Sequence, residues 1–161
     1  MKKQEYQFTY QVYASIGDLP AGDAALLQLA KETTSIAYAP YSNFLVGAVA
    51  RLINGEIVKG TNQENASYPV GICAERVLLS VASTLFPEVA VDTMAISYKS
   101  INGKSDKPVS PCGMCRQALA EFEERTKHGI RLILAGIEGE IIVVNKSRDL
   151  LPFSFGGGDL K

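Results

Sequence analysis

The sequence predicts an α/β fold in which a single mixed β-sheet of about five strands is layered with helices and carries one extra strand at the N-terminus. Segments with the two-residue period of strands alternate along the chain with segments that have the apolar spacing of helices. The chain has 161 residues, of which 47% are hydrophobic, and this is enough apolar material for one sizeable core. No repeat or Gly/Ser linker divides the chain, so we expect one domain over residues 1–161, with residues 1–19 as an extension.

The chain begins with a predicted strand and a predicted helix. Residues 6–13 alternate aromatic or β-branched side chains with polar ones, which is typical of a strand. Residues 20–38 have the apolar spacing of a helix, and Pro40 ends it. The expected apolar stripe of this helix consists of Leu26, Leu27, Leu29, Ala30 and Ile36.

A hairpin and a second helix follow. The pair Asn54-Gly55 separates residues 44–53 from residues 56–60, and such a pair is the strongest short-range signal for a β-hairpin. Residues 73–85 again have helical spacing, and Pro87 follows their end. The expected buried positions of this helix are Val77, Leu78 and Val81.

The C-terminal half alternates strands with one more helix. Residues 91–98 form the apolar run of a buried strand, and residues 112–127 predict a helix that Gly129 stops. Residues 130–135 and 140–144 predict two further strands around a glycine-containing turn. Together these segments predict one sheet covered by helices.

Charge and composition exclude several classes of protein. The 16 Lys and Arg residues are balanced by 17 Asp and Glu, without the basic excess of a nucleic-acid binder. No apolar run approaches the roughly 18 residues of a membrane span, and polar residues 4–7 stand where a secretory signal is apolar. We therefore expect a cytoplasmic protein with no nucleic-acid or membrane partner. The single histidine, His128, excludes zinc proteases of the H-E-x-x-H type and disfavours a Ser–His–Asp hydrolase.

The three cysteines lie at the predicted starts of two helices. Cys73 begins one helix, and the Cys112-x-x-Cys115 spacing in the other lets two sulfurs reach one metal ion. Helix N-termini stabilise thiolates, and a catalytic zinc site has three protein ligands and an open position for water. Glu75 is two residues from Cys73, beside the metal rather than on it, where a carboxylate exchanges protons with water and substrate. The pattern predicts a catalytic zinc site.

Each of these residues also has a simpler interpretation. Cys112 and Cys115 alone are equally typical of a redox dithiol at a helix start. A structural zinc site needs a fourth ligand, and only His128 is available, about three turns or roughly 20 Å beyond Cys115. Glu75 alone would be an ordinary glutamate in a first helical turn. The combination of three cysteines with this glutamate favours the catalytic metal site.

Several blocks of sequence carry a resemblance to a known family. A ligand-x-Glu element followed by Pro-Cys-x-x-Cys is the signature of zinc deaminases. From about Leu26 to the C-terminus the chain resembles the short, homotetrameric cytidine deaminases in which three cysteines hold the zinc. The matching blocks are residues 41–44, 46–48, 60–68, 72–76, 110–117 and 150–155. The resemblance implies a cytidine-deaminase-like α/β/α fold and hydrolytic deamination of cytidine or deoxycytidine to uridine or deoxyuridine and ammonia, in pyrimidine salvage.

The resemblance also implies roles for individual residues. Cys73, Cys112 and Cys115 would hold one zinc ion per chain, and Glu75 would carry protons between water, the ring nitrogen and the leaving ammonia. Asn62 and Glu64 would contact the ribose hydroxyls, and Phe44 would pack near the base. The Ala74 backbone N–H would contact the pyrimidine carbonyl. Tyr68 and Phe155 would reach into a neighbouring subunit's site. The implied partners are a small nucleoside substrate and further copies of the chain in a homotetramer with shared active sites.

Several of these positions have alternative explanations in the sequence alone. Asn62 and Glu64 also suit a turn, although side chains two apart on an extended segment face the same way, as a contact with a diol requires. Phe44, Tyr68 and Phe155 also suit a hydrophobic core. A nucleic-acid deaminase would share the zinc chemistry but needs a basic groove with stacking aromatics. An inactive binding homologue would have no need of the intact cysteines and glutamate.

Arg76 has a role predicted from charge. Three thiolates on Zn²⁺ leave a net charge of about −1, which makes a water at the site harder to ionise than neutral histidine ligands do. A guanidinium that donates hydrogen bonds to sulfur withdraws this excess charge, and we predict that Arg76 does so, as its counterpart does in the family. The polar loop over residues 99–108 is longer than is usual in the family, which leaves a related nucleoside-antibiotic substrate open.

Overall fold

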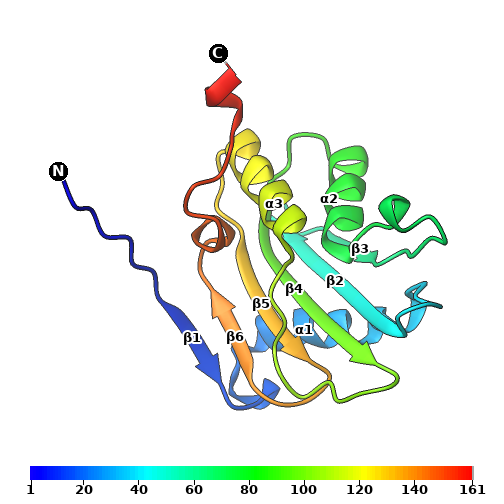
Figure 1. The fold of residues 1–161 in the computed structure, drawn as a ribbon. Coiled ribbons are helices and arrows are strands. Elements are labelled where there is room, and N and C mark those ends of the chain that lie inside the picture. The colour runs from blue at the N-terminus through cyan, green and yellow to red at the C-terminus, as the bar shows by residue number, and fades with distance from the viewer. Residues whose placement is uncertain (161) are drawn as a thin grey trace.

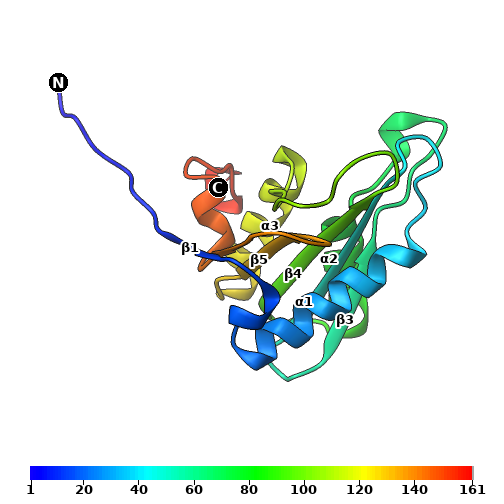
Figure 2. The ribbon, with the colours of Figure 1, turned by 90° about the horizontal axis from the view of Figure 1, so that it is seen from below.

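The computed structural model describes residues 1–160 as a six-stranded sheet between two layers of helices. The strands are β1 (Tyr10–Tyr13), β2 (Phe44–Leu52), β3 (Ile57–Thr61), β4 (Val91–Ser100), β5 (Arg131–Gly136) and β6 (Ile141–Val144). The helices are α1 (Ala21–Thr33), α2 (Ala74–Leu85) and α3 (Gly113–Thr126). Helix α1 covers one face of the sheet, while α2 and α3 lie side by side on the other (Figures 1 and 2).

The sheet is mixed, as the sequence predicts. Its strand order is β1-β6-β5-β4-β2-β3, and only β4 and β5 run parallel. A parallel pair needs a long crossover connection, and α3 lies in that connection. The β2–β3 hairpin turns at Gly55, whose φ of 89° favours glycine. The mixed sheet layered with helices and the extra N-terminal strand are therefore both confirmed.

Two apolar cores lie on opposite faces of the sheet. On one face, Leu26 and Leu27 of α1 pack against the β-branched side chains of the central strands. On the other, Leu78 of α2 and Leu119 of α3 share a larger core with alternate residues of the same strands. Fully burying a leucine contributes about 1.5–3 kcal/mol, so this second core holds the starts of α2 and α3 against the sheet.

The start of α2 lies in close backbone contact with Gly60 of β3, which has no side chain. A Cβ atom at Gly60 would lie 2.5 Å from the carbonyl oxygen of Ala74 and 2.6 Å from the backbone nitrogen of Leu78. Both atoms are backbone and cannot move aside, so only glycine lets β3 approach α2 this closely. The first turn of α2 is consequently placed directly over the end of β3.

Two predicted helix features are wrong. The first helix ends at Thr33 and continues as a 3₁₀ turn over Thr34–Ile36, whose tighter winding rotates its side chains away from the α1 stripe. Ile36 is therefore 71% exposed rather than part of the core. Helix α3 ends at Thr126, close to the predicted end, but Lys127 rather than Gly129 terminates it, because Lys127 adopts the left-handed conformation with φ of 54° and its N–H donates to the Glu123 carbonyl.

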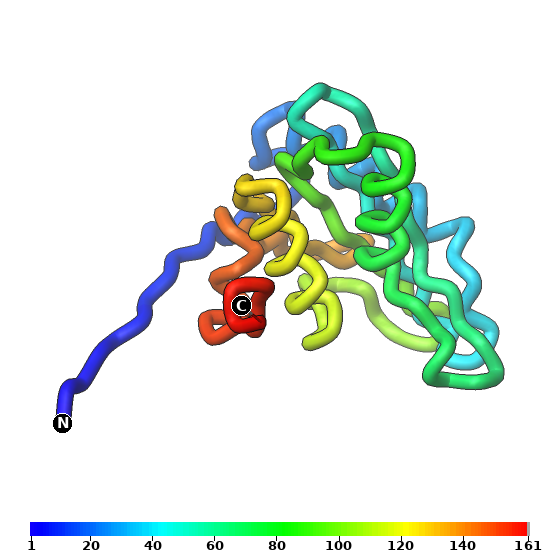
Figure 3. Tube along the Cα trace, turned by 90° about the horizontal axis from the view of Figure 1, so that it is seen from above, coloured from blue at the N-terminus to red at the C-terminus, as the bar shows by residue number. Residues whose placement is uncertain are grey.

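The N-terminal strand is shorter than the sequence pattern. Pairing with β6 runs from Tyr10, opposite Val144, to Tyr13, opposite Ile141. Strand β6 ends at Val144, so residues 6–9 have no ladder partner, and their backbone leads away from the sheet edge (Figure 3), although the side chains of Tyr6 and Phe8 still reach Asp149 and a hollow beside Leu150. Within residues 1–160, no helix has both the length and the apolar character to cross a membrane.

Candidate active site

The three cysteines come together where α2 and α3 begin. Cys73 is the N-cap of α2, Cys112 is the N-cap of α3, and Cys115 lies in the first turn of α3. Their sulfur atoms all lie within 4.8 Å of one another, with 3.8 Å between Cys73 and Cys112 and 3.4 Å between Cys112 and Cys115. All three are free thiols. Two helix N-termini thus direct their partial positive charges at one sulfur cluster.

The sulfur cluster has the dimensions of a zinc site. Thiolates bind zinc at about 2.3 Å in tetrahedral geometry, which places the sulfurs about 3.8 Å apart. The Cys73–Cys112 separation of 3.8 Å equals this value, and the Cys112–Cys115 separation of 3.4 Å is 0.4 Å shorter. Among the described residues only these three cysteines form such a group, and His128 instead lies 4.0 Å from a carboxylate oxygen of Asp92. Three protein ligands with an open fourth position are the pattern of a catalytic zinc site rather than a closed structural one.

The pKa values of two cysteines in the cluster are shifted in opposite directions. The pKa of Cys73 is lowered to about 6, chiefly because the Cys115 thiol donates a hydrogen bond to its sulfur. The pKa of Cys115 is raised by that same hydrogen bond. The positive charge of Arg76 also lowers the pKa of Cys73. One thiolate therefore forms near neutral pH even without metal, and a thiolate is the form that binds zinc.

Glu75 lies at the buried end of the same site. It occupies the first turn of α2, and it is only 5% exposed. Burial raises the pKa of its carboxyl above the ordinary value, because the charged form loses its water. A carboxyl in this environment holds its proton to a higher pH than an exposed glutamate does.

A cavity of about 500 Å³ opens over the cysteines, and we call it the cysteine pocket. Cys73, Glu75 and Cys112 line it, together with residues from β2, the 62–64 segment and the 109–110 loop. The ring of Phe44 forms one side, where it stacks on Tyr98 with ring centroids 4.7 Å apart. The volume is that of a small-molecule site.

Asn62 and Glu64 both line the cysteine pocket, on the segment between β3 and α2. The segment is extended, because Gln63 exchanges backbone hydrogen bonds with Ile72 while its neighbours bond Tyr38. Side chains alternate along an extended chain, so Asn62 and Glu64 face the same side, as the sequence predicts. Their two-residue spacing therefore places an amide and a carboxylate next to each other.

Both side chains are already held in place by hydrogen bonds. The Asn62 amide donates to the Phe44 carbonyl at 2.8 Å and accepts from the Val46 N–H at 2.8 Å. The Glu64 carboxylate accepts from the Tyr41 N–H at 2.9 Å and from the N–H and hydroxyl of Ser42. The Ser42 hydrogen bond is the main reason why the pKa of Glu64 is lowered. Each group keeps hydrogen-bonding capacity for a ligand.

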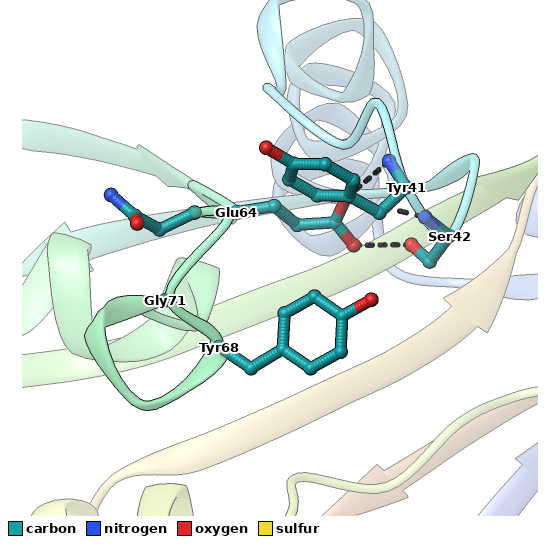
Figure 4. A pocket seen from close by; sticks show the side chains of 6 residues that line it. Tyr41, Ser42, Glu64, Tyr68 and Gly71 are labelled. Atoms are coloured by element: carbon teal, nitrogen blue, oxygen red, sulfur yellow. Dashed lines mark hydrogen bonds between the residues drawn. The ribbon is translucent and has the colours of Figure 1, made fainter.

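A second, more open hollow of about 380 Å³ adjoins the cysteine pocket at Ser42, Glu64 and Gly71. Tyr41 and Tyr68 lie on its two sides, with ring centroids 6.1 Å apart (Figure 4). We call this the tyrosine hollow. Within residues 1–160, neither the cysteine pocket nor the tyrosine hollow is lined by a lysine, an arginine or a histidine.

Three predicted residues lie at the margin of the pocket or outside it. Arg76 borders a groove between α2 and α3, and its guanidinium makes no hydrogen bond to sulfur within the described residues. Tyr68 is 77% exposed, and Phe155 is 58% exposed. The carbonyl of Phe155 accepts a hydrogen bond from Gln117 of α3 at 2.7 Å, so this part of the tail is held near the cysteine helix.

Sequence reasoning assigned no role to two residues that organise the site. Ser42 bonds Glu64 and lines both hollows. Arg116 of α3 donates three hydrogen bonds, to the Pro111 carbonyl, the Leu150 carbonyl and the Ser110 hydroxyl. For Arg116 the sequence offered one signal. It directly follows a cysteine at a helix start, and polar residues stand in the preceding loop.

The likeness to known proteins agrees with this geometry. The family described as "Cytidine and deoxycytidylate deaminase zinc-binding region" matches residues 21–128, a span that contains all three cysteines and Glu75. The chain belongs to this deaminase family. Zinc, one ion per chain, is therefore the cofactor of this deaminase, and the redox interpretation of Cys112 and Cys115 is set aside.

Individual relatives extend the likeness over most of this deaminase. A cytidine deaminase of Halalkalibacterium halodurans is 36% identical over 135 residues, which is 84% of this chain and 95% of the relative. A cytidine deaminase of Mycobacterium tuberculosis is 34% identical over 134 residues, with 81% of this chain and 87% of the relative covered.

Solved structures confirm the fold of this deaminase. The crystal structure of cytidine deaminase from Burkholderia pseudomallei matches it with a TM-score of 0.70 and 36% identity, over 81% of this chain and 97% of that one. The crystal structure of cytidine deaminase from Mycobacterium tuberculosis gives a TM-score of 0.65 and 27% identity, over 85% and 99% of the two chains.

Proposed function

We propose that this protein is a zinc-dependent hydrolase that removes the exocyclic amine of free cytidine or deoxycytidine, giving uridine or deoxyuridine and ammonia. Family membership supports the deamination, and the names of the relatives support cytidine as the substrate. The observation that carries the proposal is the cysteine pocket itself. Cys73, Cys112 and the buried Glu75 line it together with Asn62 and Glu64, and the Cys115 sulfur lies within 4.8 Å of the other two sulfurs.

Cys73, Cys112 and Cys115 are the proposed zinc ligands. The cluster supports this because its spacing suits tetrahedral thiolate coordination and leaves one position open toward the pocket. When bound there, zinc supplies a Lewis acid that makes water a competent nucleophile near neutral pH. Pyrimidine salvage is the general role of such chemistry.

Glu75 is the proposed proton carrier. Its carboxyl takes a proton from the attacking water and gives it to the ring nitrogen beside the amine-bearing carbon. It then carries the second proton of that water to the amine nitrogen, which leaves as ammonia while the carbonyl of the product forms. The position of Glu75 at the closed end of the pocket, out of bulk water, supports this role because the proton is not lost to solvent.

The remaining pocket residues bind the nucleoside. Asn62 and Glu64 contact the ribose hydroxyls, for which the free donor and acceptor positions on their side chains are suited. Phe44 packs against the base and keeps its position through Tyr98. The Ala74 backbone N–H, at the first position of α2, donates to the pyrimidine carbonyl.

The charges around the pocket favour a nucleoside over a nucleotide. A phosphate needs a lysine, an arginine or a helix N-terminus as its partner. In the part of the chain that the structure describes, neither hollow is lined by a basic side chain, and Glu64 adds a negative charge between them. The N-termini of α2 and α3 are directed at the sulfurs. Cytidine is therefore preferred to deoxycytidylate, although the family description includes both.

We further propose that the chain acts as a homotetramer in the cytoplasm. Tyr68 and Phe155 are large, exposed aromatic side chains, Tyr68 beside the tyrosine hollow and Phe155 on a tail bonded to α3, which supports a contribution of each to a neighbouring subunit's pocket. Arg76, whose charge lowers the pKa of Cys73, tunes the sulfur cluster. A reducing compartment keeps all three cysteines as thiols, and this supports the cytoplasm.

Competing substrates test the preference for a nucleoside. Initial rates are measured with cytidine, deoxycytidine and deoxycytidylate at equal, subsaturating concentrations. We expect kcat/KM for deoxycytidylate to be at least about 100-fold below that for deoxycytidine, because a dianion enters a pocket without a cation. Equal values for the two would contradict the proposed substrate class while leaving the zinc chemistry intact.

A further inference from the structure

We infer that residues 6–10 of the N-terminal segment are a positioning element, which supports one wall of the cysteine pocket from behind. The inference rests on the proposed function, because that wall is assigned to nucleoside binding. The segment precedes residue 21, where the match to the family begins.

The wall in question is the short loop before Cys112. Val109 and Ser110 line the cysteine pocket on one side and a separate hollow of about 190 Å³ on the other. Phe8 and Tyr10 line that second hollow, which we call the N-terminal hollow. One thin piece of chain thus separates the substrate site from the N-terminal aromatic residues.

The register of β1 fixes the side on which these aromatic residues lie. Tyr10 pairs with Val144 of β6, and directly paired residues project from the same face of a sheet. Val144 belongs to the core beneath α2 and α3, so Tyr10 lies on the face that carries the active site. Phe8 is two residues earlier and projects alongside it, with ring centroids 6.3 Å apart.

Hydrogen bonds connect the same segment to the loop by a second route. The Tyr6 hydroxyl donates to Asp149 at 2.9 Å, which attaches the segment to the turn over Ser147–Leu150. From that turn the Leu150 carbonyl accepts from Arg116 at 3.1 Å. The same guanidinium donates to the Pro111 carbonyl at 2.8 Å and to the Ser110 hydroxyl at 3.1 Å. The N-terminal segment, the C-terminal turn and the pocket wall are therefore joined through one side chain of α3.

Backbone hydrogen bonds hold the loop at Ile101, which bonds Asn43, and at Ser105, which bonds Glu138, but among the described residues none is made by residues 106–110. Residues 101–112 belong to no helix and no strand, so no ladder of backbone hydrogen bonds fixes them. Val109 is only partly buried, and the contacts behind it decide how far it projects into the pocket. Small displacements of a substrate-contacting wall reduce binding and productive alignment.

The experiment removes the support without touching the pocket. The double variant Phe8→Ala/Tyr10→Ala is compared with wild type for kcat and KM with cytidine, and for the Kd of uridine by calorimetry. We expect KM and the uridine Kd to rise together by about tenfold, with kcat within about twofold, because the wall contributes binding equally in ground and transition states. Zinc content and Tm are measured on the same samples.

Three variants serve as controls. Val12→Ala removes an apolar side chain from the same face of β1 that does not line the N-terminal hollow, and should leave KM unchanged. Tyr10→Phe keeps the ring and should restore the wild-type KM, whereas Tyr6→Phe removes only the Asp149 hydrogen bond and should give a smaller rise. Should the double variant fail to fold, Tyr10→Ala alone is judged by the same values.

Two outcomes overturn the inference. A double variant with wild-type KM and wild-type uridine Kd shows that the wall needs no support from the segment. A rise in KM that occurs only with a change in sedimentation coefficient shows that the aromatic pair belongs to a subunit interface instead. Neither result affects the proposed function, which fails only if wild-type protein does not turn over cytidine.

Discussion

The floor and the rim of the cysteine pocket are held in place by different means. The floor, where Cys73, Glu75 and Cys115 lie, is built on the first turns of two helices that pack on a buried core. The rim, with Tyr68 and Phe155, consists of exposed side chains, Tyr68 on the short 3₁₀ turn Tyr68–Val70 and Phe155 on the tail outside any helix or strand. One chain therefore holds the chemical groups of the site on packed helices, whereas the proposed contribution of the rim residues to a neighbouring subunit's pocket depends on assembly.

The largest expected effect comes from removing a ligand from the floor. Cys115→Ser leaves two thiolates, so the zinc content should fall well below the value of about one ion per chain and turnover should be lost. Metal analysis by mass spectrometry and a cytidine assay on one preparation measure both. Full zinc content with normal turnover would show that Cys115 is not a ligand.

Substitution of Glu75 distinguishes the loss of proton transfer from the loss of zinc. Glu75→Ala should lower kcat by about 10³-fold or more while zinc stays bound, because general acid–base catalysis is lost but the sulfurs are intact. Glu75→Gln, of nearly equal volume, controls for packing and should be equally inactive. Retention of near-normal turnover in either variant would refute the role of Glu75.

Substitutions in the rim should change KM rather than the zinc content. Phe155→Ala is expected to raise KM for cytidine about tenfold, because an aromatic contact with the substrate site is lost. Phe153→Ala, two residues away and more exposed, is the matched control and should have little effect. Dilution to monomers should silence the wild-type enzyme, and a fully active monomer would remove the shared site.

A Ser42 variant tests, through the pH dependence of KM, whether Glu64 binds the substrate as an anion. The Ser42 hydroxyl is the main cause of the lowered pKa of Glu64, so Ser42→Ala should raise that pKa. The carboxylate then takes up a proton at a higher pH, and the increase in KM on acidification should begin at a higher pH than in wild type. Profiles of kcat/KM against pH for both proteins measure this. Coincident acidic limbs would show that Glu64 does not bind the ribose as an anion.

Arg76 should give the smallest effect. Its positive charge lowers the pKa of Cys73 without a hydrogen bond to the sulfur. Arg76→Gln removes this charge, so the site releases a proton less readily and the acidic limb of the kcat profile should move to higher pH. An unshifted profile with wild-type turnover would contradict the prediction that Arg76 tunes the cluster.

Local spacing explains why the floor was predictable from sequence. The positions of Cys73, Glu75, Cys112 and Cys115 follow from helix starts that Gly, Pro and apolar periodicity mark in the chain. The hairpin at Asn54-Gly55 and the mixed sheet were predicted for the same reason. The helix starts, the hairpin and the individual strands depend on residues within a few positions of one another, and the mixed sheet follows from the alternation of these local segments.

Features that depend on distant contacts were not predicted. The Ser42–Glu64 hydrogen bonds span 22 residues and the Arg116–Leu150 bond spans 34, and no local pattern reports them. The burial of Ile36 was wrong because a 3₁₀ turn changed the helical phase. The roles assigned to the individual site residues remain predictions.

Zinc content and substrate specificity, measured on the same preparation, test the central claim most directly. Cytidine, deoxycytidine, cytosine and adenosine are assayed for ammonia release, with metal analysis of that sample. We expect turnover of cytidine and deoxycytidine alone, with about one zinc per chain. Protein without zinc, with three titratable thiols and no turnover of any of the four, would contradict the assignment of the site.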